Sequence, residues 1–387
     1  MTFDAVDFYN FGKFMYRNWF SCMVYKEASR MRQVNLAVVG AGVIGKRHIR
    51  EIANSDQCRL AAIVDPSTEA AACAASFGVP LRRDYRELLE EDRIDAVVVC
   101  TPNGTHVEIG SACINRGIPV LVEKPIADDL ARARAFADAS RVARVPVLVG
   151  HHRRHNPAVR AAKKAIVEGR IGNVVAANVM CLAYKPEAYF SEPWRRRAGG
   201  GPILINMIHE IDLIRHLCGE VVTVQAASTN RTRGYEVEDS AACTLELESG
   251  TVVNISLSDT AASPWNWDTA AGEDRQLFDY RPVPTHFFAG TDGALSLPDC
   301  ALWSYVGEKG RDRPIHDQRI SMEEGNVYAN QLRHFVDVVR GTAEPLTSAQ
   351  DATQTLAVTL AVMAAAQTGQ KIDLRTDARF KAAGGAT

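Results

Sequence analysis

The sequence predicts an α/β fold with an N-terminal doubly wound parallel sheet and a C-terminal α+β domain that holds a large, mostly antiparallel open sheet. The length of 387 residues allows two to three domains at about 150 residues each. Short apolar runs alternate with helical segments up to residue 150, which is typical of a parallel sheet. Closely spaced alternating runs begin at residue 221 and indicate antiparallel strands. We therefore divide the chain into an extension at 1–31 and domains at 32–150 and 151–387.

Composition excludes several classes of protein and partner. The 44 Lys and Arg residues nearly balance the 46 Asp and Glu residues, so no global basic field attracts nucleic acid. The nine cysteines include no Cys-x-x-Cys pair, which favours reduced thiols over a disulfide framework or a zinc site. No run approaches the ~18 apolar residues of a membrane span. We expect a soluble, cytoplasmic protein without a metal, nucleic-acid or membrane partner.

The first 30 residues are crowded with nine aromatic side chains among scattered charges. They lack the unbroken apolar segment and the small-residue cleavage site of an export signal. Two interpretations stay open. This segment is either an aromatic arm that packs on the body or on a partner subunit, or the product of translation assigned upstream of a true start at Met31.

A glycine-rich loop follows the first apolar run at 34–39 and opens a helical stretch that ends at residue 53. Gly40 permits a tight turn, Gly42 lets the backbone approach a pyrophosphate, and Gly45 lets the helix pack close to the strand. The first helical residues offer free N–H groups to the phosphates. An ordinary turn is the alternative, which the strand, loop and helix context disfavours. The loop residues that we expect to bind a dinucleotide are Gly40, Gly42, Val43, Ile44 and Gly45.

An acidic residue ends the second apolar run, at 60–64. Asp65 lies twenty residues beyond Gly45, where a carboxylate can accept hydrogen bonds from the adenosine ribose hydroxyl groups. A carboxylate there repels a 2′-phosphate, and no arginine follows directly. The sequence therefore predicts NAD as the cofactor, with NADP less favoured.

Two more strand ends carry polar residues. An expected helix at 85–91 and strand at 95–100 lead into Thr-Pro-Asn-Gly-Thr-His, and a strand at 118–122 leads into Glu-Lys-Pro. Ligands of doubly wound sheets bind beyond the carboxyl ends of the strands. We therefore expect one crevice to collect, besides Gly42 and Asp65, the residues Thr101, Pro102, Asn103, His106, Glu123 and Lys124.

Together these motifs resemble the glucose–fructose oxidoreductase and inositol dehydrogenase family (Gfo/Idh/MocA), whose first domain is a Rossmann fold. The resemblance also includes Gly-Gly-Gly at 199–201 and His-Glu-Ile-Asp at 209–212, and it covers about 32–370. It implies an NAD(P)-dependent oxidoreductase acting on CH–OH groups. It places Lys124 in the catalytic pocket and suggests a cis peptide bond before Pro125. Without the resemblance, a lysine at a strand end is more often a solvated charge.

Apolar residues at helical spacing predict a helix over 203–217. His209, Asp212 and His216 share a face of this helix away from the apolar stripe, so Asp212 could fix the tautomer of His209. A helical histidine taken alone is more often structural. The resemblance instead gives His209 the position of the family's catalytic-pocket histidine, and Asp212 is then either its partner or a structural residue.

One departure from the family pattern affects the proton transfer. Many members carry an aspartate four residues before this histidine, whereas this chain has Ile205 there, and the neighbouring Asn206 cannot titrate. Either His209 alone, or His209 together with Lys124, must then transfer the proton.

The remaining candidates for substrate contact lie in the second domain, which we expect to bind substrate and to form oligomers. Arg153 and His155 in the segment 151–156 touch substrate or nicotinamide, or are merely solvated. The three histidines of this segment could indicate a metal site, but no cysteine or carboxylate lies at ligand spacing from them. Tyr184, Lys185, Trp194 and the arginines at 195–197 can form a substrate wall. The expected substrate-binding residues are Lys124, Arg153, Tyr184, Trp194, Asn206 and His209.

Strands are expected at 221–229, 238–247 and 251–258 and through 285–305, and helices near 323–340 and 348–368. One face of this sheet can cover the helices. The resemblance implies that the other face builds a homodimer or homotetramer.

Three functions remain open. The first is NAD-dependent oxidation of a secondary alcohol of a sugar or cyclitol by hydride transfer to nicotinamide. The second is oxidation of a carboxylated cis-dihydrodiol in aromatic degradation, which the arginines at 195–197 favour slightly. The third, from another class, is a non-catalytic regulator that senses a dinucleotide or a sugar. Retention of both Lys124 and His209 disfavours the regulator.

Overall fold

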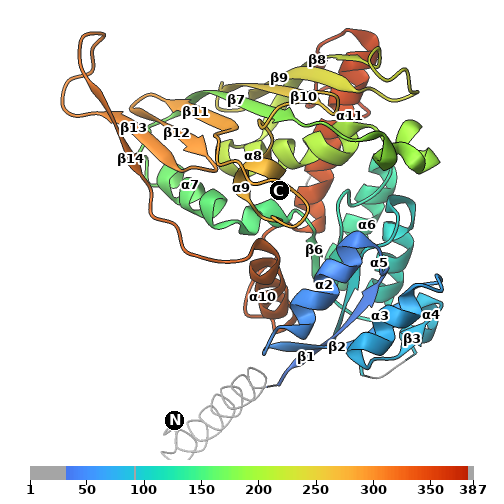
Figure 1. Ribbon diagram of the computed structural model, residues 1–387. Coiled ribbons are helices and arrows are strands. Elements are labelled where there is room, and N and C mark those ends of the chain that lie inside the picture. Colours follow the sequence, from blue (N-terminus) through green and yellow to red (C-terminus); the bar gives the residue numbers. More distant parts are fainter. Residues whose placement is uncertain (1–31, 91–92, 382–387) are drawn as a thin grey trace, which may run out of the picture.

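The computed structural model describes residues 32–90 and 93–381, so the aromatic extension lies outside the described residues. The described chain forms two sheets, one of six parallel strands and one of nine mixed strands, which lie in the lower and upper parts of Figure 1. The predicted fold class is confirmed. No helix in this part of the chain is long and apolar enough to cross a membrane.

The six-stranded sheet has the order β3-β2-β1-β4-β5-β6, and its paired strands are parallel. Its strands are β1 (Val34–Val39), β2 (Cys58–Val64), β3 (Leu81–Arg82), β4 (Ala96–Val99), β5 (Val120–Val122) and β6 (Val147–Val149). The strand order reverses between β1 and β4. In an open parallel sheet this reversal marks the crevice where ligands bind.

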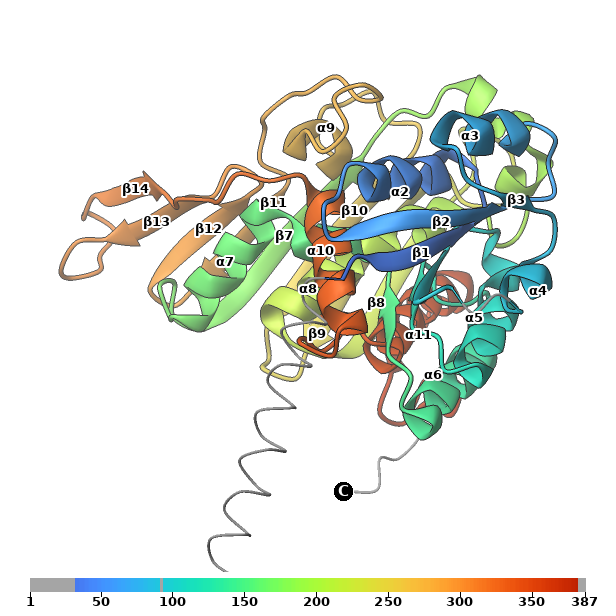
Figure 2. The ribbon, with the colours of Figure 1, turned by 90° about the horizontal axis from the view of Figure 1, so that it is seen from below.

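Helices cover both faces of this sheet, which explains why four of its strands are buried along their whole length. Figure 2 shows α2 and α3 on one side of the sheet and α5 and α6 on the other. These helices, with the short α4, are α2 (Val43–Ala53), α3 (Ala70–Phe77), α4 (Tyr85–Leu88), α5 (His106–Asn115) and α6 (Leu130–Ala143).

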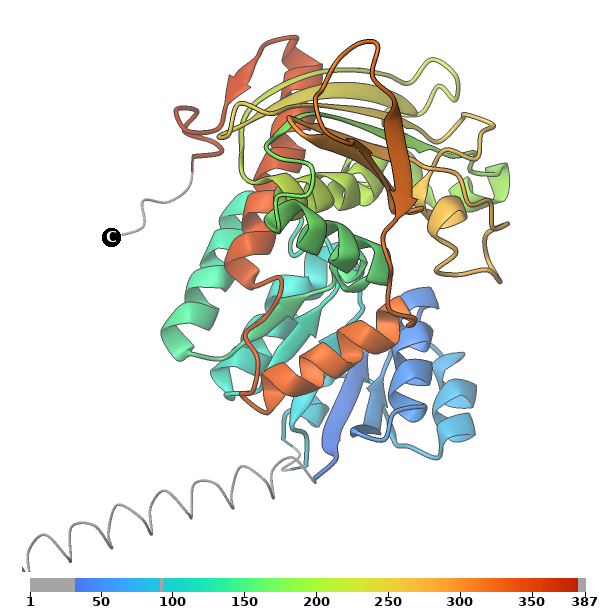
Figure 3. The same cartoon turned by 90° about the vertical axis from the view of Figure 1, so that its left-hand side faces the viewer.

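The helix α10 (Val327–Val339) belongs to the N-terminal core although it lies far along the chain. Its residues Leu332 and Phe335 join the same apolar cluster as Leu36 on β1 and Ile49 on α2. Figure 3 shows α10 lying along the parallel sheet, connected to the upper sheet by a long segment. The packing therefore crosses the division that the sequence places at residue 150.

The second sheet has the order β14-β13-β12-β11-β7-β10-β9-β8-β15. Only the pair β7 and β10 is parallel among its described pairings, as expected for a mostly antiparallel sheet. The strands are β7 (Val174–Leu182), β8 (Val221–Thr229), β9 (Ser240–Leu247), β10 (Val252–Ser258), β11 (His286–Gly290), β12 (Gly293–Leu297), β13 (Ala301–Tyr305), β14 (Ile315–Arg319) and β15 (Ile372–Asp373).

Helices pack on one face of this sheet and leave the other open. The covering helices are α7 (Pro157–Val167), α8 (Ile208–Cys218) and α11 (Ala349–Thr368), with the short α9 (Trp267–Ala271) at one end. The longest of them, α11, contributes Leu356 to the N-terminal core and Ala361 to the C-terminal core. It therefore joins the two halves of the molecule.

The helix expected at 203–217 begins differently from the prediction. Its first turn, Ile203–Met207, is a π-helix, and the α-helix α8 starts at Ile208. A π turn shifts the hydrogen-bond ladder by one residue and frees backbone groups, and such turns are frequent at functional sites. The carbonyl oxygen of Ile205 in this turn accepts a hydrogen bond from Lys124 instead.

Candidate active site

A cavity of about 1330 Å³ lies at the carboxyl edge of the parallel sheet. Ordinary small-molecule pockets measure about 300–1,000 Å³, so this one has room for an extended ligand. Its lining includes six of the residues expected to bind cofactor, which are Gly40, Gly42, Asp65, Thr101, Pro102 and Asn103. The C-terminal half contributes the opposite wall through Trp194, Arg197, Gly199 and Leu204. The cavity is therefore a cleft between the two halves.

The glycine loop has the shape that a pyrophosphate requires. Gly40 has a φ of 96°, and a Cβ atom there would meet the Cys100 carbonyl oxygen at 2.6 Å. A Cβ on Gly45 would overlap the Gly40 carbonyl, whereas a Cβ on Gly42 would meet nothing within 4 Å. Val43 and Ile44 are exposed at the start of α2, where no side chain caps the free N–H groups. The loop thus offers an uncapped helix N-terminus beside open space, which fits a dinucleotide phosphate.

Asp65 lies at the end of β2 and is held by the loop that it faces. Its Oδ2 accepts a hydrogen bond from Ala41 N at 2.7 Å, and its Oδ1 accepts one from Ser67 N at 2.8 Å. Burial alone would raise the pKa of Asp65, but these hydrogen bonds and the nearby Arg83 guanidinium hold it below its ordinary value. A fixed, ionised carboxylate in this cleft is suited to the ribose hydroxyl groups of NAD.

Two of the expected cofactor residues, His106 and Glu123, are buried and do not line the cleft. His106 is buried, with Nδ1 2.8 Å from the Pro125 carbonyl oxygen and Nε2 2.8 Å from the Thr101 carbonyl oxygen. Glu123 is also buried and accepts a hydrogen bond from His48 Nε2 at 2.9 Å. Neither lines the cavity. Their hydrogen bonds fix the strand ends that carry Thr101 and Lys124.

Lys124 connects the parallel sheet to the helix that carries His209. It follows β5, its peptide bond to Pro125 is cis, and its Nζ donates a hydrogen bond to the Ile205 carbonyl oxygen at 3.1 Å. Burial lowers the pKa of Lys124, and Arg153 adds to this effect while Glu123 opposes it. The amine therefore reaches the π turn immediately ahead of His209, from the opposite half of the molecule.

His209 lies in a buried cluster of histidine rings. Its ring centroid is 5.3 Å from that of His152 and 6.3 Å from that of His151. Its Nδ1 has no hydrogen-bond partner among the described residues. Burial, reinforced by the positive charges of Lys124 and Arg153, holds the pKa of His209 well below its ordinary value. The neutral form of the imidazole is therefore favoured, and its buried Nδ1 has no partner in the described part of the protein.

The expected pairing of Asp212 with His209 is wrong. Asp212 Oδ1 and Oδ2 accept hydrogen bonds from Arg154 at 2.7 and 2.9 Å, and Thr355 donates another. A side chain three residues on shares a helix face only approximately, and the guanidinium of Arg154 is the stronger partner for a buried carboxylate. Of the two roles that the sequence left open for Asp212, the structure supports the structural one.

Arg153 is not a solvated surface residue, because only 4% of it is exposed. Its guanidinium binds Glu210 at 2.7 Å and Asp268 at 3.2 Å. His152 stacks on Tyr328 at 4.8 Å and lies 3.4 Å from a carboxylate oxygen of Glu273. Among the described residues, no three His, Cys, Asp or Glu side chains are arranged to hold a metal ion.

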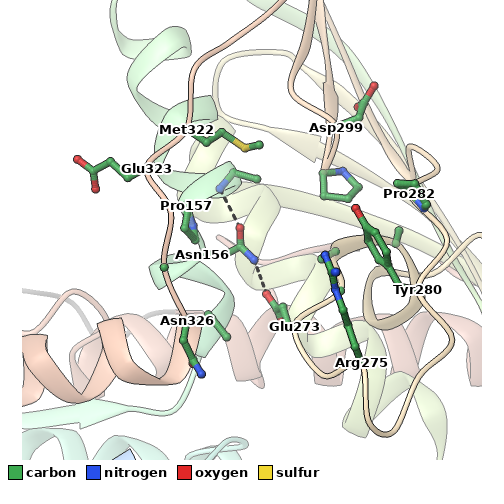
Figure 4. A pocket seen from close by; sticks show the side chains of 17 residues that line it. Asn156, Pro157, Glu273, Arg275, Tyr280, Pro282, Asp299, Met322, Glu323 and Asn326 are labelled. Carbon is green, nitrogen blue, oxygen red and sulfur yellow. Dashed lines mark hydrogen bonds between the residues drawn. The ribbon is translucent and has the colours of Figure 1, made fainter. Parts of the chain in front are cut away.

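A second cavity of about 500 Å³ lies on the other side of Glu273. Figure 4 shows the Asn156 amide donating to Glu273 at the wall of this cavity. Arg275, Tyr280 and Asn326 line the same space. Glu273 thus lines this cavity and also lies beside His152.

The other expected substrate residues, Asn206, Tyr184 and Trp194, lie in three different environments. Asn206 is in the π turn, and its Oδ1 accepts a hydrogen bond from Lys185 Nζ at 2.6 Å. Tyr184 is exposed, with Arg233 5.8 Å from its ring. Trp194 lines the large cavity together with the glycine loop, so it lies at the dinucleotide cleft.

Several residues of the site have no signal in the local sequence. Arg83 donates to the backbone carbonyl groups of Asp65 and Pro66, yet it comes from the next strand–helix unit. Asp268 and Glu273 lie in and after α9, which no sequence pattern singled out. Their contacts arise from the tertiary fold, so spacing along the chain could not have revealed them.

A Rossmann-type cleft with a glycine cradle, an ionised acid beside it and a lysine that reaches the turn ahead of His209 from the other half is typical of a nicotinamide-dependent oxidoreductase. Comparison with known sequences agrees. The sequence profile "Oxidoreductase family, NAD-binding Rossmann fold" matches residues 34–151, and "GFO/IDH/MocA C-terminal domain" matches residues 159–278. The chain belongs to the Gfo/Idh/MocA family of NAD-binding oxidoreductases.

Named relatives extend over most of the chain. The 1,5-anhydro-D-fructose reductase of Ensifer adhaerens is 29% identical over 88% of this chain and 98% of its own. The inositol 2-dehydrogenase of Rhizobium meliloti (strain 1021) is 29% identical over 84% and 94%. The solved structure of the WlbA dehydrogenase from Bordetella pertussis, a complex with NADH and UDP-GlcNAcA, matches with a TM-score of 0.72 and 26% identity over 89% and 99%. The chain is therefore an NAD-dependent oxidoreductase.

Proposed function

We propose that this dehydrogenase oxidises a secondary alcohol of a sugar or cyclitol. The observation that carries the proposal is the hydrogen bond from Lys124 Nζ to the Ile205 carbonyl oxygen. It brings the strand end of the NAD-binding half against the helix of His209. The names of the relatives, an anhydrofructose reductase and an inositol dehydrogenase, support a polyol as the substrate class.

The residues of the cleft have separate tasks in this reaction. The glycine loop and Asp65 hold the dinucleotide, whose nicotinamide accepts a hydride when it is bound. The Lys124 ammonium group donates hydrogen bonds to the substrate oxygen and stabilises the negative charge that develops on it. The neutral imidazole of His209 hydrogen-bonds the same hydroxyl group and orients it.

The two alternative functions have weaker support. Arg195 and Arg197 suggested a carboxylated diol, but Arg195 donates to the Tyr189 carbonyl oxygen at 2.6 Å and Arg197 lines the dinucleotide cavity. A regulator without chemistry has no need of a buried lysine beside a histidine with a lowered pKa.

An assay of NAD reduction over a panel of inositols, aldoses, anhydro sugars and carboxylated diols tests the proposal. We expect at least one neutral polyol to reduce NAD. We expect Lys124→Ala to lower turnover by about 100-fold or more, with NADH binding unchanged in fluorescence titrations. Reduction by carboxylated diols alone would favour the dihydrodiol reaction. Tight NAD binding without reduction by any alcohol would favour the regulator.

A further inference from the structure

Two lysines from different parts of the fold meet the same π turn. Lys124 Nζ donates to the Ile205 carbonyl oxygen at 3.1 Å, and Lys185 Nζ donates to the Asn206 side-chain oxygen at 2.6 Å. Both acceptors are neutral and belong to adjacent residues one turn ahead of His209. Each ammonium group carries three N–H donors, so each keeps further donors beyond the one hydrogen bond to the turn.

The backbone places Lys185 firmly at this position. Lys185 follows the end of β7, and its N–H donates to the Asp259 carbonyl oxygen at 2.8 Å. Its own carbonyl oxygen accepts a hydrogen bond from Arg233 at 2.7 Å. Its ammonium group lies 4.8 Å from the Tyr189 ring centroid. The side chain is only 15% exposed, so its head group is held in the protein and not in bulk solvent.

The charged groups that face this ammonium group come from several segments, including Glu238 between β8 and β9. Asp259, after β10, lies 4.0 Å away, and Arg233 neutralises it through an ion pair of 2.9 Å. Asp268 on α9 and Lys124 act from a greater distance with opposite signs, and Cys181 on β7 is a buried thiol. Burial lowers the pKa of Lys185 to about 8, because Asp259 opposes it only in part. Near pH 8, the amine group of Lys185 can therefore both lose and accept a proton.

The surroundings of His209 disfavour its protonation. The positive charges of Lys124 and Arg153 and two neighbouring histidines disfavour an imidazolium ion in addition to the cost of burial. Ile205 and Asn206 supply no carboxylate in the preceding turn. A general acid–base group is most effective when its pKa lies near the working pH, and Lys185, which hydrogen-bonds the turn ahead of His209, has a pKa lowered to about 8.

We propose that Lys185 is a catalytic residue that exchanges the proton with the reacting hydroxyl group, while Lys124 and His209 hold the oxygen. In the oxidation, the O–H bond breaks and its proton binds the neutral amine of Lys185, which becomes ammonium. The C–H bond breaks with its electron pair, the hydride passes to the co-reactant, an oxidised nicotinamide, and the carbon becomes a carbonyl. This inference rests on the proposed function.

Competitive labelling of lysines with trace acetic anhydride across a pH series tests the titration of Lys185 without any substrate. Peptide mass spectrometry reads the reactivity of each lysine in the NADH-loaded protein. Lys163 is the matched control, since its Nζ also donates to one neutral oxygen, the His216 carbonyl oxygen at 2.7 Å, away from the cleft. We expect the reactivity of Lys185 to rise near pH 8. Equal pH dependence of the two lysines would overturn the inference.

Variants then test catalysis. Lys185→Arg keeps a cation and a donor for Asn206 but cannot lose its proton, so it separates proton transfer from structure. We expect this variant and Lys185→Met to lose about 100-fold or more in kcat, with NADH affinity unchanged. The rise of the oxidation rate through pH 8 should disappear, and methylamine should restore part of the activity of Lys185→Ala.

These experiments distinguish failure of the role of Lys185 from failure of the proposed function. Wild-type kcat and pH profile in Lys185→Arg would refute the role of Lys185, whereas Lys163→Met should keep both. A wild-type protein that reduces NAD with no polyol would contradict the proposed function, and the labelling would still decide whether Lys185 titrates near pH 8.

Discussion

At the scale of one side chain, we expect Asp65 to set the choice between NAD and NADP. Its carboxylate is fixed by Ala41 N and Ser67 N, and Arg83 lies beside it on the backbone of the same turn. We expect Asp65→Ala to weaken NADH binding by about 10-fold or more, since hydrogen bonds to charged groups contribute about 1.5–3 kcal/mol. NADPH should bind better, because the repulsion is gone and the Arg83 guanidinium becomes available to the 2′-phosphate. Fluorescence titrations of both reduced cofactors measure this change.

A second substitution isolates the arginine. In the Asp65→Ala background, Arg83→Met should remove the part of the NADPH gain that comes from Arg83 and leave NADH binding at its already weakened level. An unchanged preference for NADH in Asp65→Ala would move the ribose contact to another residue.

Residues of the site that belong to one local motif were predictable, and those assembled by the tertiary fold were not. Strand, glycine loop and helix are contiguous in the sequence, so the amino-acid order alone assigns Gly40, Gly42 and Asp65 to the cofactor cleft. Arg83 reaches Asp65 from the next unit of the fold. The hydrogen bond between Lys185 and Asn206 joins the end of β7 to the π turn, and neither residue type nor spacing encodes such a contact.

At the scale of elements, α8 is anchored by buried ion pairs that the sequence could not show. Asp212 binds Arg154, and Glu210 binds both Arg153 and His286. Removal of Asp212 leaves the buried Arg154 with Asp351 as its remaining carboxylate partner, and loss of a buried ion-pair partner costs up to about 3–5 kcal/mol. We therefore expect Asp212→Ala to lower the free energy of unfolding by that amount in urea titrations. Asp138→Ala, which removes an exposed ion pair with Arg141 on α6, should cost under about 1 kcal/mol. Equal losses in the two variants would contradict the role of burial.

The same ion pairs predict how stability depends on pH. Burial alone would raise the pKa of Glu210, but Arg153 and the hydrogen bond from His286 lower it to about 2. The folded pKa lies below the unfolded value of about 4.3, so this contribution is fully present above that pH. It is lost as the pH falls toward 2. Urea unfolding between pH 6 and pH 3 should show a declining free energy, and Glu210→Gln should show a shallower decline. A slope equal to that of the wild type would exclude Glu210 as its source.

Hydrophobic periodicity was sufficient to predict most strands and helices but not how they pack. The strand expected at 221–229 is β8, and the helix expected at 348–368 is α11 with one residue fewer. The pattern of α10 indicates an amphipathic helix and says nothing about which sheet it covers. Its return to the N-terminal core and the π turn ahead of α8 depend on contacts between distant segments.

At the scale of the whole molecule, α11 and α10 make the two halves one body. The helix α11 packs on α6 of the first half and on β8 of the second, and α10 contacts both α2 and the segment His152–His155. The cleft therefore lies between halves joined by two helices. This arrangement is consistent with a lysine from one half held at a fixed distance from a helix of the other.

The outer face of the nine-stranded sheet is the remaining surface to account for, and we expect it to join subunits into a homodimer or homotetramer. Val252, Phe287 and Trp303 lie on this face by strand register, and each is more than a third exposed. Apolar side chains on a broad sheet face gain stability when a second copy covers them. Sedimentation velocity should show an oligomer that Trp303→Glu together with Phe287→Glu dissociates, while Val142→Glu on α6, an exposed apolar position away from the sheet, leaves it intact. A monomeric wild-type protein, or an oligomer that survives the double substitution, would place the subunit contact elsewhere.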